Sequence, residues 1–251
     1  MGDHFKEAVL LIKTAWGGKS LFKDFHPPSS GGEVGKYCNL MIAQVREGLS
    51  DLAKDFPEVK GRRPELAGFV WYQGWNDGVD PMNAIPEYEQ NLVNLIYDIR
   101  REFNSPKLPV VIGELTGPWV MAESEWDALR KAQVAAANRP EFAGNVLFVP
   151  THGFVRKPED SPNPGHGHHE FGNAETYLLV GSALGNGMVE LCSLRESKRR
   201  SKIGGQGGTR TLTPLRNWNL NPARLPISPL AQIAPKRLPF GRMVRPQEAS
   251  K

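Results

Sequence analysis

The amino-acid sequence predicts an α/β fold built on a mostly parallel sheet. Three observations support this prediction: apolar runs of strand length recur along residues 1–190, segments with helical spacing separate them, and the runs are apolar at every position. A continuous apolar run is typical of a strand that helices cover on both faces. Alternation of such strands with helices specifies a parallel sheet between two helical layers.

The first half of the alternation begins with an apolar run, Ala-Val-Leu-Leu-Ile, which predicts a strand over residues 8–12. A Gly-Gly turn at residues 17–18 and a Pro/Ser-rich loop follow it. Residues 35–56 place apolar side chains three and four positions apart, which predicts a helix. The second strand is predicted over residues 66–72, where the chain breaks into Gln-Gly-Trp-Asn-Asp.

The second half repeats the same rhythm. Apolar spacing predicts helices over residues 86–103, 123–138 and 173–190, and apolar runs predict strands over residues 109–114 and 145–149. Gly181 and Gly185 weaken the helical pattern of the last segment. Four strands and four helices are therefore expected in one domain.

Charge divides the chain into two parts. Residues 191–251 hold 13 Lys+Arg and 2 Asp+Glu, a net charge of +11, so residues 1–190 hold the other 18 and 25, a net charge of −7. The second part also has seven prolines between Pro214 and Pro246 and no periodic apolar pattern. We therefore expect a folded domain over residues 1–190 and a basic, Pro/Gly-rich tail over residues 191–251 that is disordered or artefactual.

The bulk features exclude several classes of function. Cys38 and Cys192 lie far apart without a CxxC pair, so neither a disulfide framework nor a zinc site is indicated. The sequence shows no signal-peptide pattern and no apolar run of about 20 residues, so we expect no membrane partner. The basic cluster at residues 198–202 could bind nucleic acid, but aromatic residues are sparse around it, and we expect no nucleic-acid partner.

Two turns could stabilise a negatively charged oxygen. An Asn side chain at Asn76, after the second strand, supplies an N–H donor, and a glycine turn at Gly17 and Gly18 lets the backbone approach a substrate closely. Such donors together form an oxyanion hole, the feature that stabilises the tetrahedral intermediate of ester hydrolysis. The competing interpretation is that both segments are ordinary strand-to-helix turns.

Taken in order, four segments resemble the SGNH hydrolases, in particular the sialate O-acetylesterase-like carbohydrate esterases. The segments are residues 11–21, 71–74, 111–115 and 172–177, and the resemblance covers about residues 5–190. It implies a flavodoxin-like three-layer α/β/α sandwich and serine-dependent removal of acyl groups from sugars, without a cofactor. It also implies that Gly17 or Gly18 and Asn76 line the oxyanion hole, with Gln73 as the competing amide donor.

The resemblance places the catalytic base, a histidine, at His169 on the loop before the last helix, and His168 is its main competitor. Asp160 and Glu170 are weak candidates for the residue that orients the base, because the position three before His169 holds His166 instead of an acid. His166, His168 and His169 also raise the possibility of a metal site. Their spacing matches no metal motif and no carboxylate partner is apparent, so no metal is expected.

The family's nucleophile is a serine in a Gly-Asp-Ser or Gly-Gln-Ser turn after the first strand, and no serine of this sequence stands in such a turn. Ser20 is expected to cap the turn that follows it. We therefore expect an N-terminally truncated domain that lacks the first, central strand and is inactive by itself, with unpaired backbone groups on its neighbours. The alternative is a non-catalytic carbohydrate-binding or scaffold domain.

The expected substrate is an acylated carbohydrate, which Trp16 and Trp75 could contact by stacking, although both could equally be core residues. Members of the resembling family are commonly exported, but no address is visible in this sequence.

Overall fold

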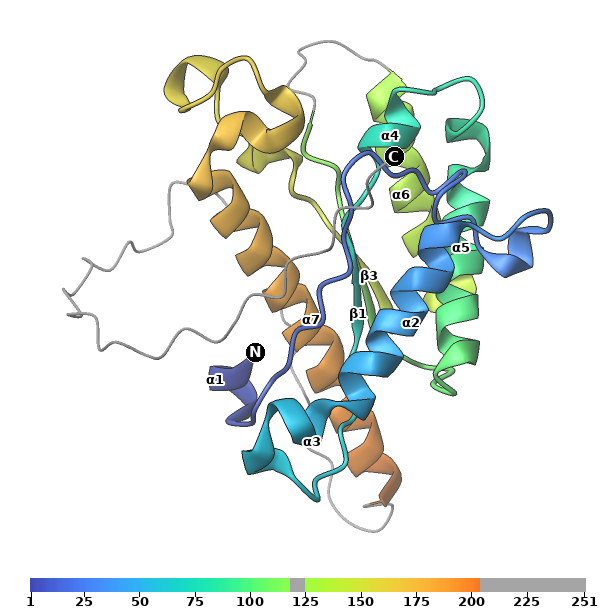
Figure 1. Cartoon of the computed structure of the whole chain (residues 1–251), viewed down its shortest axis with the longest axis vertical. Helices are drawn as coiled ribbons and strands as arrows, with labels where there is room; N and C mark the ends of the chain where they lie inside the picture. The colour runs from blue at the N-terminus through green and yellow to red at the C-terminus, as the bar shows by residue number, and fades with distance from the viewer. Residues whose placement is uncertain (118–124, 204–251) are drawn as a thin grey trace, which may run out of the picture. The chain divides into compact units, whose positions relative to one another are not determined.

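The computed structural model describes residues 1–117 and 125–203, and it contains a three-stranded parallel sheet (Figure 1). The strands are β1 (Phe69–Trp71), β2 (Val110–Gly113) and β3 (Val146–Val149), in the order β1-β2-β3. Val70 is paired with Val111, and Val111 with Leu147. The α/β class with a parallel sheet is therefore confirmed, and three of the four predicted strands form.

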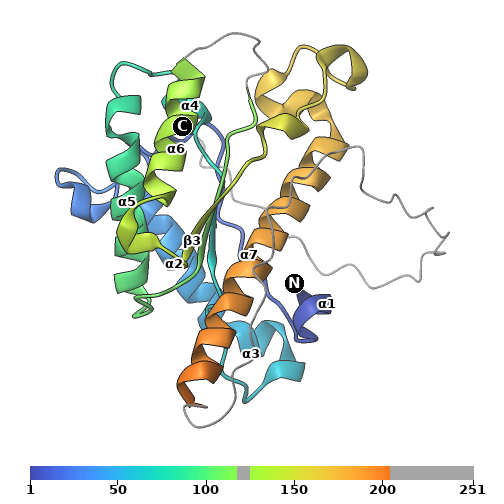
Figure 2. The same ribbon diagram turned by 180° about the vertical axis from the view of Figure 1, so that it is seen from behind.

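Helices cover both faces of the sheet. The long helices α2 (Lys36–Ser50), α5 (Ile85–Glu102) and α6 (Glu125–Ala137) lie on one face, and α7 (Ala174–Ile203) lies on the other (Figures 1 and 2). The buried residues accordingly form two clusters, one between the sheet and the first group of helices and one beneath α7. This is the expected three-layer arrangement.

Short elements connect these layers. They are the α-helices α1 (Gly2–Phe5), α3 (Leu52–Asp55) and α4 (Trp75–Gly78) and the 3-10 turns Pro28–Ser30, Pro57–Val59, Pro140–Phe142, His152–Phe154, Pro158–Asp160 and Gly167–Gly172. Four of the six 3-10 turns begin at a proline, whose fixed φ suits the first position of a helical turn. The segments that follow the three strands all belong to one edge of the sheet, because the strands are parallel.

Residues 8–12, predicted as the first strand, are not a strand. They form no ladder, and Val9, Leu10 and Leu11 are 44%, 44% and 81% exposed. A strand requires a hydrogen-bonded neighbour, and β1 pairs only with β2 in the described parts of the chain. The prediction recognised a sequence suited to a buried strand, but no described segment pairs with it, and only Ile12 is partly covered, by Gly48 of α2.

Helix α7 continues well beyond residue 190, where the sequence placed the end of the domain. Leu191 is 3% exposed and belongs to the cluster beneath α7. The apolar spacing of Leu184, Met188 and Leu191 carries the buried stripe across the predicted boundary. The predicted tail lies outside the described residues from position 204 onward.

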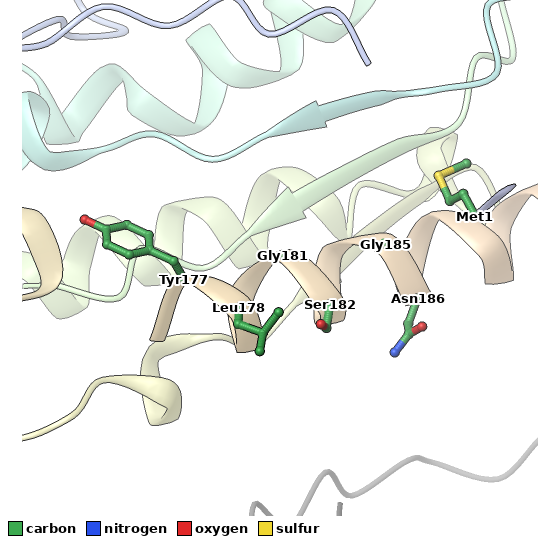
Figure 3. Close-up of a pocket in the computed structure, with 7 residues that line it drawn as sticks. All are labelled: Met1, Tyr177, Leu178, Gly181, Ser182, Gly185 and Asn186. Carbon is green, nitrogen blue, oxygen red and sulfur yellow. The ribbon is translucent and has the colours of Figure 1, made fainter. Parts of the chain in front are cut away.

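Within residues 1–117 and 125–203, one helix is long and apolar enough to span a membrane by length and composition, the Ala174–Ser197 part of α7. Its apolar stripe packs on the sheet: Leu184 contacts Gly113 of β2, and Gly187 faces Val149 of β3. Packing on the sheet accounts for part of the apolar character of α7, since 33% of this stretch is buried, while Leu178 remains 69% exposed and lines a cavity of about 400 Å³ (Figure 3).

Candidate active site

Two turns that are distant in the sequence are fastened together at the carboxyl edge of the sheet. Asp77 accepts hydrogen bonds from the backbone N–H groups of Leu21 and Phe22, both at 2.9 Å. Gln73 Nε2 donates to the carbonyl of Lys19 at 2.9 Å. These three bonds fix the Gly-Gly turn after residue 16 beside the turn after β1.

The Asp77 carboxyl is completely buried. Burial raises its pKa, although hydrogen bonds from Gln73, Leu21 and Phe22 oppose that shift. A buried carboxylate is costly unless its oxygens are hydrogen-bonded. The turn of residues 19–22 supplies those donors, so the two turns stabilise each other.

This arrangement brings Gly18 and Asn76 together. Gly18 has a left-handed φ of +68°, and a Cβ built at Gly18 would lie 4.0 Å from Asn76 Nδ2. Within the described chain, neither the N–H of Gly17 or Gly18 nor the side-chain amide of Asn76 has a hydrogen-bond partner. The Gly18 backbone and the Asn76 amide, whose N–H groups have no partner among the described residues, therefore lie close to each other at the sheet edge.

Gln73, the competing amide donor, is occupied. Its Nε2 donates to Lys19 O and, at 2.6 Å, to Asp77 Oδ2, and its Oε1 accepts from Tyr88 Oη at 3.3 Å. A side-chain amide has only two N–H groups. Gln73 therefore has no donor left for a substrate, and Asn76 is the better candidate.

The loop that carries His166, His168 and His169, called the histidine loop from here on, lies at the same edge of the sheet. The His168 ring lies 6.0 Å from the ring of Trp75, the residue before Asn76, and the His169 ring lies 4.3 Å from that of His168. Tyr177 Oη donates to the carbonyl of His169 at 2.8 Å, which ties the loop to α7. The structure thus brings the histidine loop to the turn that carries Asn76.

The rings of His168 and His169 make no hydrogen bond with the described residues, whereas the other four imidazoles do, among them His152 and His166 in or near this loop. His152 Nδ1 donates to the carbonyl of Thr116 at 2.6 Å, and His166 Nδ1 lies 2.5 Å from Asn163 Nδ2. Neutral His152 therefore carries its proton on Nδ1 and leaves Nε2 free to accept one. His166, paired with an amide donor, has the opposite tautomer.

The sequence analysis named His166 only as a possible metal ligand and as the residue three positions before His169, and it missed His152. His152 follows β3 by three residues, and only its place at the end of a strand could have indicated it.

The two candidate orienting acids differ in environment. Asp160 is exposed, while Glu170 is 7% exposed and accepts a hydrogen bond from Thr116 Oγ1, which in turn contacts Tyr72 Oη. Glu170 Oε2 is buried without a partner, and burial raises the pKa of this carboxyl. Glu170 also has a left-handed φ of 50°, which is strained for a residue with a side chain.

The two candidate tryptophans lie in different places. Trp16 packs against the core, with its ring 5.1 Å from Tyr37 and 6.1 Å from Phe25. Trp75 is half-buried between Trp126 of α6, at 4.9 Å, and His168. Of the two, only Trp75 stands at the edge that carries Asn76.

Ser20 has the capping role predicted for it. Its hydroxyl donates to Asp24 at 3.2 Å and accepts the N–H of Lys23 at 3.1 Å. A hydroxyl engaged on both sides is a structural group, so Ser20 is not placed to attack a substrate. Both cysteines are free thiols, and burial raises the pKa of Cys38 to about 11.

Residues 1–117 and 125–203 contain no group of three or more His, Cys, Asp or Glu side chains placed to hold a metal ion. The three neighbouring imidazoles of the histidine loop are all exposed, and His166 is already bound to Asn163.

Comparison with known proteins gives one match. A family model described as carbohydrate esterase, sialic acid-specific acetylesterase, matches residues 2–177. Neither the curated proteins nor the solved structures gave a match.

Proposed function

Because the chain belongs to the sialic acid-specific acetylesterase family of carbohydrate esterases, we propose that its sheet edge is an O-acetylesterase site that binds acylated sugars. The proposed site consists of an oxyanion hole and a histidine base. We also propose that the chain is inactive by itself, because its sequence shows no suitable serine nucleophile. This part of the proposal is separate from the oxyanion hole and the base.

The observation that supports the proposal best is the pairing of Gly18 with Asn76. The N–H groups of Gly17 and Gly18 and the Asn76 amide would donate to the oxygen of the acetyl carbonyl as it becomes negatively charged. Because these donors are held by the Asp77 network before substrate arrives, they need no rearrangement during the reaction. Removal of one such donor typically lowers the rate about 10²–10³-fold.

The proposed base is His169. A neutral imidazole would take the proton of an attacking serine and then return it to the leaving sugar oxygen; water would attack the acyl-serine in a second step. His152 is the alternative base, since its hydrogen bond to Thr116 leaves Nε2 free.

The proposed reaction needs a serine hydroxyl as its nucleophile. No serine of the sequence stands in a Gly-Asp-Ser or Gly-Gln-Ser turn, and Ser20 is occupied by Asp24 and Lys23. We therefore propose that the chain binds an acetyl group without hydrolysing it at an appreciable rate. The second candidate, a non-catalytic carbohydrate-binding domain, is favoured by the aromatic pair Trp75 and Trp126 at the same edge.

Two measurements test the proposal. The first is NMR titration of the ¹⁵N-labelled chain with acetate, whose carboxylate imitates the oxyanion, and with 9-O-acetylated sialic acid. We expect saturable shifts of the Gly18 amide and the Asn76 side-chain amide, abolished by Asn76→Ala and unchanged by Asn39→Ala, an exposed asparagine on α2. If both ligands leave the Gly18 and Asn76 signals unmoved, the oxyanion hole is rejected.

The second measurement is acetate release from the same O-acetylated sugar. We expect a rate equal to that of buffer. A saturable rate well above buffer, lost in Asn76→Ala, would support the esterase site and reject its inactivity. Sugar binding that persists in Asn76→Ala but is lost in Trp75→Ala would favour the carbohydrate-binding alternative.

A further inference from the structure

Of the six histidines, His26 alone has both ring nitrogens in contact with backbone carbonyl oxygens of the described chain. Its Nδ1 lies 2.9 Å from the oxygen of Phe22, and its Nε2 lies 2.8 Å from the oxygen of Gly31. Both separations are those of normal N–H···O hydrogen bonds. The ring therefore bridges two points of the loop that leads from the Gly17-Gly18 turn to α2.

Two carbonyl acceptors require two donors. A carbonyl oxygen has no proton to give, and a neutral imidazole carries only one N–H. In the neutral form, the second nitrogen would direct its lone pair at a carbonyl oxygen at hydrogen-bond distance. The protonated ring has an N–H on each nitrogen and satisfies both contacts. The geometry at His26 therefore selects the imidazolium form.

The backbone fixes the position of this ring. Gly35 N–H donates to the carbonyl of His26 at 2.9 Å, and a Cβ built at Gly35 would lie 2.5 Å from the His26 nitrogen. Tyr37 N–H donates to the carbonyl of Asp24, also at 2.9 Å. The start of α2 is thus packed on residues 24–26, and residues 26–35 form a closed loop that the His26 side chain crosses to reach Gly31.

A single residue, Phe22, connects His26 to the candidate oxyanion hole. The N–H of Phe22 donates to Asp77 Oδ1, and its carbonyl accepts from His26 Nδ1, both at 2.9 Å. In the described chain no backbone N–H donates to this carbonyl, so His26 is the group that satisfies it. The turn that Asp77 holds from one side is therefore held by His26 from the other.

The second contact reaches the core. Gly31 ends the turn Pro28–Ser30, which lies against α5 (Figure 1). Ser29 N–H donates to Asp98 of α5 at 2.8 Å. His26 therefore links the Gly-Gly turn of the candidate site to a helix that packs on the sheet.

The charged groups of the neighbouring segments are occupied elsewhere or exposed. Asp24, on the same segment as His26, is paired with Lys19 at 3.5 Å, and Asp98 of α5 is paired with Arg101. His26 itself forms no ion pair in the described chain. The remaining charged side chains of the loop and of the start of α2 are exposed: Lys23, Glu33 and Lys36.

We propose that His26 is a positioning residue for the oxyanion hole: its protonated ring binds the carbonyls of Phe22 and Gly31 and so holds the turn that carries Gly18 against Asp77. We call these two hydrogen bonds the clamp. The role in the hole rests on the proposed function, whereas the clamp does not. A neutral ring keeps only one of the two bonds, and histidines change charge between about pH 5 and 8. The turn should therefore loosen as pH rises through that window.

Two measurements on the ¹⁵N-labelled full chain test the clamp. In long-range ¹H–¹⁵N spectra at about pH 5.5, both ring N–H signals of His26 should be observable, because hydrogen bonds slow their exchange with water, whereas the unpartnered rings of His168 and His169 should show none. In amide hydrogen exchange, corrected for the intrinsic effect of pH, the protection of Phe22 should fall by about tenfold or more between pH 5.5 and 8.

Matched variants separate the clamp from other titrating groups. His26→Arg keeps charged N–H donors at every pH, so the protection of Phe22 should no longer depend on pH. His26→Ala should give weak protection at both pH values, and His4→Ala, at a histidine of α1, should behave as the wild type. Asp77 acts in the opposite direction, because its carboxylate accepts better as pH rises. If His26→Ala does not fold, wild type and His26→Arg suffice for the comparison.

Acetate affinity connects the clamp to the hole. In high salt, which screens the added charge, His26→Arg should bind acetate several-fold more tightly than the wild type at pH 8 and equally at pH 5.5. The proposal is overturned if His26 shows a single ring proton at pH 5.5, if wild type and His26→Arg share one pH dependence, or if acetate affinity does not follow the protection of Phe22. A wild type that binds no acetate at either pH would reject the proposed function, while the exchange data still decide the clamp.

Discussion

Asp77 and Leu21 are joined across 56 positions of the sequence: the Asp77 carboxylate accepts the Leu21 N–H at 2.9 Å, with both residues fully buried. In each turn the bonded residue follows a proposed donor in the sequence: Leu21 comes three positions after Gly18, and Asp77 comes directly after Asn76. The geometry of the proposed oxyanion hole therefore depends on a group that need not touch the substrate.

Asp77→Ala should destabilise the fold and loosen the hole. It leaves the N–H groups of Leu21 and Phe22 without their acceptor, and each buried unpaired group costs about 1–3 kcal/mol. We expect the free energy of unfolding in urea to fall by about 2–4 kcal/mol and acetate binding to be lost. Asp51→Ala, at an exposed carboxylate paired with Lys54, should change stability by less than about 0.5 kcal/mol. Equal effects of the two substitutions would contradict the role given to Asp77.

Gly18→Ala should be destabilising where Gly17→Ala is not. Gly18 has a φ of +68°, which costs a residue with a Cβ about 1–2 kcal/mol, whereas Gly17 has no positive φ and open space around its Cβ position. The comparison is made by urea unfolding at one pH. If Gly18→Ala proves as stable as Gly17→Ala, the left-handed turn is not the conformation in solution.

Glu170 should make stability depend on pH. Burial raises the folded-state pKa of Glu170 above its ordinary value of 4.5, so in the window above 4.5 the folded state binds more protons than the unfolded state. The stabilising contribution is complete below pH 4.5 and is lost as pH rises through the folded pKa. We expect the free energy of unfolding of the wild type to fall relative to Glu170→Gln between pH 4 and 7. Parallel pH profiles for the two proteins would show that this carboxyl is not buried.

His152 should have a single neutral tautomer. Because Nδ1–H donates to Thr116 O, Nε2 is the unprotonated nitrogen at alkaline pH. Long-range ¹H–¹⁵N spectra at pH 8 distinguish the two ring nitrogens directly. We expect one Nδ1–H form for His152 and a mixture of tautomers for His169, whose ring has no partner among the residues described. A tautomer mixture at His152 would remove it as an alternative base.

The sequence predicted those parts of the fold whose signals are local. The strands at residues 69–71, 110–113 and 146–149 lie within apolar runs bounded by turn residues, and the helices follow apolar periodicity. Residues 8–12 carry the same signal but form no strand, because strand formation requires a neighbour that the sequence pattern cannot guarantee. The continuation of α7 was missed because the apolar periodicity stops after Leu191 and charged residues become frequent in the sequence.

For the candidate site, motif order predicted that Gly18 and Asn76 would meet. The choice between Asn76 and Gln73 could not be made, since it depends on hydrogen bonds to Lys19 and Asp77 that only the folded chain forms. The fixed tautomer of His152 and the burial of Glu170 likewise depend on Thr116, a residue with no motif of its own.

Thr116 is completely buried, and its two oxygens serve three segments: the hydroxyl contacts Tyr72 after β1 and Glu170 of the histidine loop, and the carbonyl binds His152 after β3. Each of these segments is held by its own contact with the same buried residue. The edge of the sheet should therefore open and close as one cooperative unit, so that a ligand ordering any one loop would slow the fluctuations of all three.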